Sequence, residues 1–313
     1  MAQRRATALF HKVHEVASRR LWQPFLTLST LAYATIALTP VCLLGAYSIF
    51  TQNGYSFHPA LDFANFVTGI TEPGNLSVLS KTLEIMFLAA AISTVVAYAV
   101  AYCVAVVAPR LLRPMMVVAM FALFGGYLVR VFAWRILLGP DGIFATLFGR
   151  PGPLAGIGDL ANSRWAVLLA LVNFSIPLCL LPIISTFSSL DHHLLSASRD
   201  LGAGSLVTFR RVVFPLTQRG MCFGFAIAFI LCAGDYVTPA LLGGTDGFMF
   251  GSLIAQQFNL TYDWPNGGVL ALILMASVAL VISVVFALIG LTARILSGAS
   301  RSPWSPDVDA SAA

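Results

Sequence analysis

Charged residues are scarce in this sequence. They make up 10% of the 313 residues, whereas hydrophobic residues make up 58%, and the mean hydropathy is +0.86. A soluble domain carries about 25% charged residues. The shortage of charge therefore excludes an ordinary soluble protein and predicts an all-α, polytopic membrane protein.

Lysine is almost absent, and this excludes ATP hydrolysis by the chain. A P-loop requires G-x-x-x-x-G-K-[ST], and neither Lys12 nor Lys81 follows such glycines. His14 and Glu15 open an H-E-x-x-H pattern, but Ser18 stands where the second histidine should be. G-x-S-x-G is missing, and the cysteines show no C-x-x-C spacing. We predict that this chain is not an enzyme and holds no metal and no cofactor.

Six apolar segments are long enough to cross a membrane, since a spanning helix needs roughly 20 apolar residues. The predicted spans cover about residues 26–50, 79–106, 114–138, 165–187, 221–242 and 267–291. The chain thus divides into an N-terminal segment (1–25), a six-span domain (26–291) and a C-terminal tail (292–313). Pro177 and Pro182 in the fourth span indicate either a static kink or a bend that serves transport.

Most basic residues fall on one side of this topology. With a cytoplasmic N-terminus, all but five of the 18 basic residues lie in segments 1–25, 107–113, 188–220 and 292–313. The positive-inside rule then places both termini in the cytoplasm. Residues 1–20 form either a basic amphipathic helix on membrane lipid or a partly disordered tail. Basic patches interleaved with aromatic residues are absent, which argues against nucleic acid as a partner.

The segment 188–217 is a polar interruption between the fourth and fifth predicted spans. Asp191 suits a helix N-cap, and Gly202 suits the left-handed position that follows a helix. Ser205 can cap a second helix, which carries Phe209 and which Pro215 ends. Two short helices with apolar and basic side chains cannot bury themselves in so short a loop, so the segment predicts a partner groove. The alternative is an ordinary amphipathic interfacial loop.

The order of residues in this segment resembles the EAA loop of ABC importer permeases, which docks onto a separate ATPase subunit. Leu-x-x-Ala-x-Arg-Asp-Leu-Gly-Ala begins at Leu194, and Phe-Arg-Arg-Val and Pro-Leu follow it. Ser-Ala-Ser from Ser196 stands where the family usually has Glu-Ala-Ala, so the carboxylate is missing. The ATPase-coupling residues that the resemblance implies are Ser196, Ala197, Ser198, Asp200, Gly202, Phe209 and Pro215.

Three further stretches are similar to permeases of the spermidine/putrescine group, and the resemblance covers about residues 60–295. They are residues 128–139, 234–244 and 263–268. The resemblance implies a type I ABC importer permease fold in a bacterial inner membrane. It implies two copies of a cytoplasmic ATPase, a second related permease and a periplasmic solute-binding protein as partners.

The cargo that this resemblance implies is a polyamine such as spermidine or putrescine. Another small solute of the same group is an alternative. An ATP-independent secondary transporter is the alternative from a different class, although it would leave the segment 188–217 unexplained.

Ionisable side chains inside a span face a partner or a wet cavity by default. One hypothesis is structural: Arg130 or Arg135 of the third span pairs with Asp235 or Glu84. The other hypothesis is a cation-attracting path in which aromatic rings hold an amine, although interfacial belts also explain such rings. The candidate translocation path consists of Glu84, Arg130, Trp134, Asp235 and Tyr236.

Overall fold

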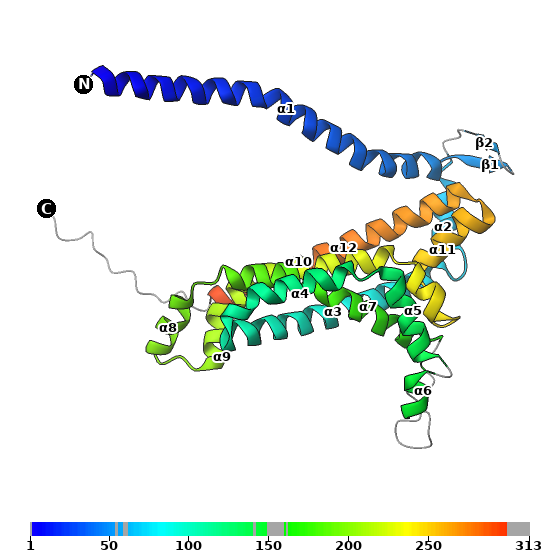
Figure 1. Cartoon of the computed structure of the whole chain (residues 1–313). Helices are drawn as coiled ribbons and strands as arrows, with labels where there is room; N and C mark the ends of the chain where they lie inside the picture. Colours follow the sequence, from blue (N-terminus) through cyan, green and yellow to red (C-terminus); the bar gives the residue numbers. More distant parts are fainter. Residues whose placement is uncertain are drawn as a thin grey trace.

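The computed structural model describes residues 2–53, 56–58, 62–139, 142–148, 160 and 162–298, and it describes the side chains of residues 1–24 in no detail. The predicted surface helix at residues 1–20 depends on those side chains and so lies outside the described part, as does the tail from residue 299. Within the described part, the chain is almost entirely helical (Figure 1). The all-α, polytopic fold predicted from composition is confirmed.

Twelve helices are described as α-helical, and shorter π-helical or 3-10 segments join several of them. The α-helices are α1 (Ala2–Ser48), α2 (Ala64–Thr71), α3 (Asn75–Val107), α4 (Leu112–Phe124), α5 (Tyr127–Leu138), α6 (Ile143–Phe148), α7 (Arg164–Ser188), α8 (His192–Asp200), α9 (Ser205–Thr208), α10 (Phe214–Gly234), α11 (Phe250–Gln256) and α12 (Trp264–Gly298). The joining segments are η1 (Pro109–Leu111), η3 (Phe209–Val213), η4 (Pro239–Gly243) and η5 (Gln257–Thr261). An antiparallel hairpin of β1 (Thr51–Asn53) and β2 (Ser56–His58) pairs Thr51 with His58.

The core lies where α3, α7 and α10 pack against one another. Small residues allow this close approach: Ala89 and Ala97 of α3 are fully buried. On α10, a Cβ atom at Gly220 would lie 2.8 Å from the carbonyl oxygen of Pro182 and would also clash with Thr186. In lipid, close packing of small residues is what holds helices together, since hydrocarbon gives no hydrophobic drive.

Helix α1 stands apart from this core and meets the bundle near its own C-terminal end, beside α12 (Figure 1). Its apolar part, Phe25–Ser48, has none of its most hydrophobic window buried within the chain. Tyr33 and Ile36 are 77% and 75% exposed. A helix that is this apolar and this exposed requires lipid or another chain around it.

Figure 1 places two groups of short elements at opposite ends of the bundle. Helices α8 and α9 lie at one end, and α5, α6, α11 and the hairpin lie at the other. We call these the α8 end and the α11 end. The long helices between them connect the two ends directly.

Five helices of the described chain are long and apolar enough to cross a membrane, and a sixth span is counted if one sharply bent pair crosses together. The five helices cover Phe25–Ser48, Asn75–Val107, Arg164–Ser188, Ser205–Gly234 and Trp264–Thr292. Four of them match predicted spans closely. Helix α7, which corresponds to the fourth predicted span, continues through Pro177 and Pro182 without a break.

The single helix predicted for residues 114–138 is wrong, because the chain turns by 81° between α4 and α5. Gly125 and Gly126 lie at the break, and Gly125 adopts an extended ψ of 103°. Two consecutive glycines weaken a helix, since each loses more backbone freedom there than alanine does. The third predicted span is therefore a broken one.

The fifth helix also differs from its prediction. It begins at Ser205, inside the predicted loop, and ends at Gly234, before the predicted end at residue 242. Pro215 does not end a helix: the chain stays helical from Ser205 to Gly234, and Pro215 lies just after the π-helical segment η3. Ser205 is not the cap either, because the N-cap of α9 is Gly204, which makes no side-chain capping bond.

Candidate functional site

The turn between α8 and α9 has the geometry that its sequence predicts. The backbone N–H of His193 donates to Asp191 Oδ1 at 2.9 Å, which caps the start of α8. At the other end, Gly202 has φ +77°, and the N–H of Ala203 donates to the carbonyl of Ser198 at 3.1 Å. This six-to-one bond with glycine in the left-handed position is a Schellman motif. Gly202 therefore fixes how α9 leaves α8.

The predicted coupling residues divide into exposed and structural ones. Ser196, Ala197 and Asp200 lie on the exposed side of α8. The Ser198 hydroxyl lies 2.9 Å from that of Thr208, so it ties α8 to α9. Ser198 therefore holds the shape of the segment.

Two leucines beside these residues present the apolar surface that a partner would cover. Leu201 is 88% exposed and Leu206 is 70% exposed. Leu201 lies in the turn and Leu206 at the start of the helix that continues into the span, and apolar side chains this exposed indicate contact with a partner or with lipid. Neither Leu201 nor Leu206 was among the coupling residues expected from the sequence.

Phe209 faces inward and joins the segment to α3. Its ring lies 5.2 Å from that of Tyr102 and 6.2 Å from that of Tyr98, both edge-on. Edge-to-face pairs at these separations are favourable. Pro215 is also half-buried within the helix that follows. Phe209 and Pro215 thus belong to the packing between the segment and the spans and do not themselves present a docking surface.

A cavity of about 530 Å³ lies between the end of α3 and this segment. Tyr102 and Pro109 line one side, and Leu195, Asp200 and Thr208 line the other. The cavity is mixed in polarity, and an acid stands at its edge. Its walls come from both the membrane helix and the segment, so a change in the angle of α8 would alter it.

At the α11 end, the broken third span meets the end of α10. The hydroxyl of Tyr127, the first residue of α5, donates to Asp235 Oδ1 at 2.5 Å and lies 2.8 Å from the Thr238 hydroxyl. Asp235 also accepts the backbone N–H groups of Val237 and Thr238, each at 3.0 Å. The carboxylate therefore caps the turn that leads into η4, as N-cap residues do.

Arg130 lies in the same cluster but bonds elsewhere. One guanidinium nitrogen donates to the carbonyl of Ala122 near the end of α4, which satisfies a carbonyl left open by the helix break. The guanidinium carbon lies 5.5 Å from the centre of the Phe174 ring, and the Tyr127 ring packs on that same ring at 5.3 Å. The remaining nitrogen, Nη1, is buried without a hydrogen-bond partner in the described part of the chain.

The predicted ion pairs between the spans are wrong for the described residues. Asp235 is bound by Tyr127 and Thr238, and Arg130 by Ala122 and Phe174, so neither completes the expected pair. The ion pair that does form joins Arg164 to Asp246 at 3.8 Å, and both side chains are about half exposed. Sequence reasoning did not foresee these hydroxyl and carbonyl partners.

Glu84 and Trp134 do not join the Asp235 cluster. Glu84 is exposed on α3 and lines a small cavity of about 50 Å³ with Lys81, Arg164 and Asp246. Trp134 is half-buried and packs on Phe144 with ring centres 6.5 Å apart. The five residues of the candidate path thus do not form one cluster at the α11 end.

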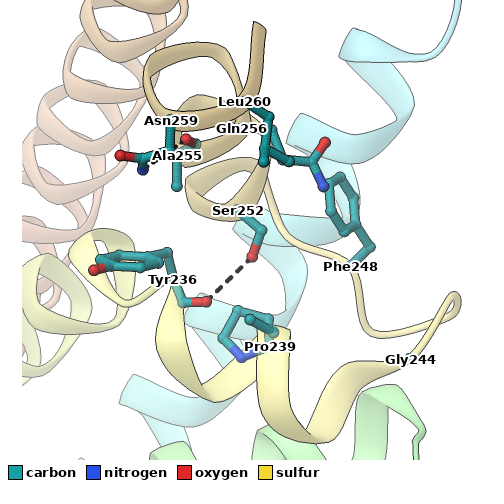
Figure 2. A pocket seen from close by; sticks show the side chains of 10 residues that line it. Tyr236, Pro239, Gly244, Phe248, Ser252, Ala255, Gln256, Asn259 and Leu260 are labelled. Carbon is teal, nitrogen blue, oxygen red and sulfur yellow. Dashed lines mark hydrogen bonds between the residues drawn. The ribbon is translucent and has the colours of Figure 1, made fainter. Parts of the chain in front are cut away.

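Tyr236 lines a pocket of about 370 Å³ at this end, which we call the outer pocket (Figure 2). Pro239 and Gly244 form one wall, and Ser252, Gln256 and Asn259 of α11 and η5 form the other. The Ser252 hydroxyl donates to the carbonyl of Tyr236 at 3.3 Å and holds the walls together. None of the residues that line the pocket is charged.

Tyr127 is the functional residue that sequence reasoning missed. It links the broken third span to the wall of the outer pocket through Asp235 and Thr238. The signal available was its position directly after Gly125 and Gly126, where a helix restarts.

Comparison with known proteins identifies the family. The family model described as the inner membrane component of binding-protein-dependent transport systems matches residues 111–296, more than half of the chain. The chain belongs to this family. It is therefore the permease subunit of an ABC importer in the inner membrane, and in such importers ATP is hydrolysed by a separate subunit.

Relatives support the same assignment. The permease is 28% identical to the Haemophilus influenzae spermidine/putrescine transport system permease protein PotB, over 80% of this chain and 87% of the relative. It is 27% identical to PotB of Escherichia coli (78% and 89% covered) and to the E. coli inner membrane ABC transporter permease protein YdcU (74% and 77% covered). The resemblance to the spermidine/putrescine group is confirmed at the level of sequence.

The fold is also known. A bacterial ABC transporter involved in the import of the acidic polysaccharide alginate matches with a TM-score of 0.59 and 16% identity, covering 86% of this chain and 97% of that one. At this identity the likeness concerns the fold alone. Membership of an ABC importer family decides against the secondary-transporter alternative.

Proposed function

We propose that this permease carries a polyamine-like cation across the inner membrane, and that the α8–α9 segment receives the force from the ATPase. The family assignment gives the importer, and the named substrates of the PotB relatives support the cargo. The observation that carries the coupling role is the rigid turn at Gly202, which sets two exposed leucines outward.

In this proposal both termini and the α8 end face the cytoplasm. Arg110, Arg113, Arg210, Arg211 and Arg219 all lie at or near the α8 end, and the positive-inside rule supports this orientation. Two copies of an ATPase grip the α8–α9 segments of this chain and of a second, related permease. A periplasmic solute-binding protein delivers cargo to the α11 end.

Charge supports a cationic cargo at the α11 end. From residue 220 to residue 293 the chain contains no lysine, arginine or histidine, and its ionisable acids are Asp235, Asp246 and Asp263. The outer pocket lies within this stretch and offers the Tyr236 ring together with the Gln256 and Asn259 amides. An aromatic face attracts an ammonium group, and amide oxygens accept its hydrogen bonds.

Within this path we assign the candidate residues different roles. Tyr236 contacts cargo in the outer pocket, and Glu84 attracts it from the exposed face of α3. Asp235 is a positioning residue, because its oxygens are already occupied by Tyr127, Thr238 and two backbone N–H groups. Arg130 and Trp134 hold the broken third span in place.

Uptake by the complete importer in proteoliposomes tests the cargo. Radiolabelled spermidine and putrescine should accumulate only with ATP, and Tyr236→Ala should raise the half-saturating concentration several-fold more than Tyr236→Phe does. Tyr33→Ala, an exposed tyrosine at the other side of the fold, is the matched control. Uptake of a neutral or anionic solute with no effect of polyamines would contradict the cargo while leaving the importer assignment intact.

A further inference from the structure

An apolar groove of about 610 Å³ runs along the surface between α3 and the start of the fifth helix, at the α8 end. Val95, Ala99 and Tyr102 line it from α3, and Leu206, Phe209 and Phe214 line it from the other helix. None of its lining residues is acidic. We call it the α3–α9 groove.

The floor of this groove is held firmly. The Tyr98 hydroxyl lies 2.7 Å from that of Thr217 and joins α3 to α10. The Phe209 ring packs on Tyr102 from above, with ring centres 5.2 Å apart. At the rim, Val95 is 65% exposed and Leu206 is 70% exposed. The groove is thus a preformed, open surface that no described part of the chain fills.

The groove lies at the depth of one leaflet. Tyr102 is five residues from the end of α3 and Val95 is twelve, which corresponds to about 8 and 18 Å along a helix. Its long direction therefore follows the hydrocarbon chains of one leaflet. Its mouth is at the membrane interface, where tyrosine side chains are enriched.

A positive charge stands beside the mouth. Arg210 is exposed and lies four residues after Leu206 and four before Phe214, both of which line the groove. Arg210 lies in the π-helical segment η3, where residues four to five apart lie close to one face, and its neighbour Phe209 lines the groove. Arg211 is also exposed, but it belongs to the adjacent face with Val207 and Pro215. Arg210 thus provides a cation where a lipid headgroup would lie.

We propose that the α3–α9 groove binds one anionic phospholipid, with an acyl chain against Tyr98, Tyr102 and Phe209 and the phosphate against Arg210. Basic sites between membrane helices recognise anionic headgroups in this way. A protein segment is the less favoured occupant, because the groove lies within the span, has no acid and little polarity, and faces a lipid leaflet. The bound lipid would hold α3 against the helix that carries the coupling force. This inference does not depend on the cargo.

The test uses the complete importer in nanodiscs that contain equal amounts of phosphatidylglycerol and phosphatidylcholine with matched acyl chains. Native mass spectrometry after mild detergent release measures which lipid stays bound. A benzophenone on the acyl chain of phosphatidylglycerol maps the contact by cross-linking. We expect phosphatidylglycerol to be retained over phosphatidylcholine, with cross-links on residues 95–102 and 206–214.

Two pairs of variants locate the site. Arg210→Gln should lower retention of phosphatidylglycerol about fivefold, as expected for one arginine close to an anionic lipid, whereas Arg211→Gln should lower it much less. Ala99→Phe should fill the groove and abolish cross-linking, whereas Val100→Phe, an exposed position about 100° further round α3 that does not line the groove, should not. The Ala99 pair keeps the test sharp if the arginine variants assemble poorly.

Three results would overturn the inference. Equal retention of the two lipids would show that the groove does not select an anionic headgroup. Equal effects of Arg210→Gln and Arg211→Gln would contradict the placement of the phosphate against Arg210. Cross-links from the groove to the second permease or the ATPase in place of lipid would show that a protein occupies it.

Discussion

The two ends of this permease are built from similar local turns but differ in the charge of the segments that follow those turns. At the α8 end, Gly202 turns the chain, the π-helical segment η3 follows, and arginines surround it. At the α11 end, Gly244 turns the chain with φ +55°, the π-helical segments η4 and η5 lie beside it, and the nearby ionisable residues of 220–293 are acids. Similar local turns thus present a basic, apolar surface at one end and an uncharged pocket with two amide side chains at the other.

The difference indicates a division of labour along the same long helices. In the proposed function, the α8 end receives the force from the ATPase through its fixed turn and outward apolar residues. The α11 end admits a cation through a pocket that neutral groups line within a stretch free of basic residues. The predictions below test whether the two ends can be damaged separately.

The largest expected effect is on the turn at the α8 end. Gly202→Asp places a side chain at φ +77°, where there is space but the backbone disfavours it by about 1–2 kcal/mol. The turn reopens and uptake falls at least tenfold, although the protein still inserts in the membrane. Transport in proteoliposomes is the measurement.

Gly204→Asp is the matched control, because it adds the same charge two residues away. Gly204 is the N-cap of α9 with φ −66°, and aspartate is favoured at such caps. We expect this variant to keep most of its transport. Equal losses in both variants would show that charge, and not the turn, is responsible.

Next in size is the packing that connects the ends. Gly220→Leu forces a side chain into the carbonyl of Pro182 and into Thr186. Overpacking of this kind destabilises by about 1–3 kcal/mol or more. Gly290→Leu, with nothing within 4 Å of its Cβ, should leave the melting temperature in detergent unchanged. Similar melting of both variants would contradict the tight α7–α10 contact.

A smaller effect is expected for Asp235→Asn at the α11 end. The amide keeps one acceptor oxygen but no longer offers a charged oxygen to its donors. A hydrogen bond to a charged group contributes about 1.5–3 kcal/mol. Melting temperature and polyamine uptake should fall, while co-purification of the ATPase stays normal. Asp246→Asn breaks a half-exposed ion pair, which contributes about 0–1 kcal/mol, and should do far less. If the ATPase no longer co-purified with Asp235→Asn, damage at the α11 end would have affected the α8 end, and the two ends would not act independently.

The smallest effect is expected for Tyr127→Phe. It removes one hydroxyl from the cluster while three donors to Asp235 remain, so stability should fall by about 1 kcal/mol. Tyr33→Phe, on the exposed face of α1, provides the reference. Thermal unfolding in detergent measures both. A fall of several kcal/mol would mean that Tyr127 does more than anchor the break.

Composition and local signals were sufficient for much of this fold. Apolar length located four spans closely, and the Gly202 turn followed from its position after a polar helix. The errors at residues 114–138 and at Pro215 have a physical cause. Residue propensities alone do not show whether a helix breaks at a pair of glycines or continues through a proline. Pro215 was interpreted as an end because proline breaks a helix interior, yet it lies just after the π-helical segment η3 and the helix continues through it.

The candidate site was harder to predict because its partners are distant in sequence. One hypothesis from the sequence paired Asp235 with an arginine. The structure pairs it with the hydroxyl of Tyr127, which belongs to the broken helix that the sequence predicted to be continuous. Without the break at Gly125, Tyr127 cannot be placed next to Asp235. Coulomb attraction alone favours an ion pair, whereas hydroxyl and backbone donors satisfy the carboxylate locally without burying a second charge.

The most direct test of the account is affinity purification of this permease from native membranes in mild detergent, with mass spectrometry of the proteins that accompany it. The account predicts that an ATPase and a second, related permease co-purify with it, and that polyamine flux in proteoliposomes requires all of them and ATP. A permease that purifies alone and carries flux alone would contradict the claim that the α8–α9 segment takes its force from another subunit.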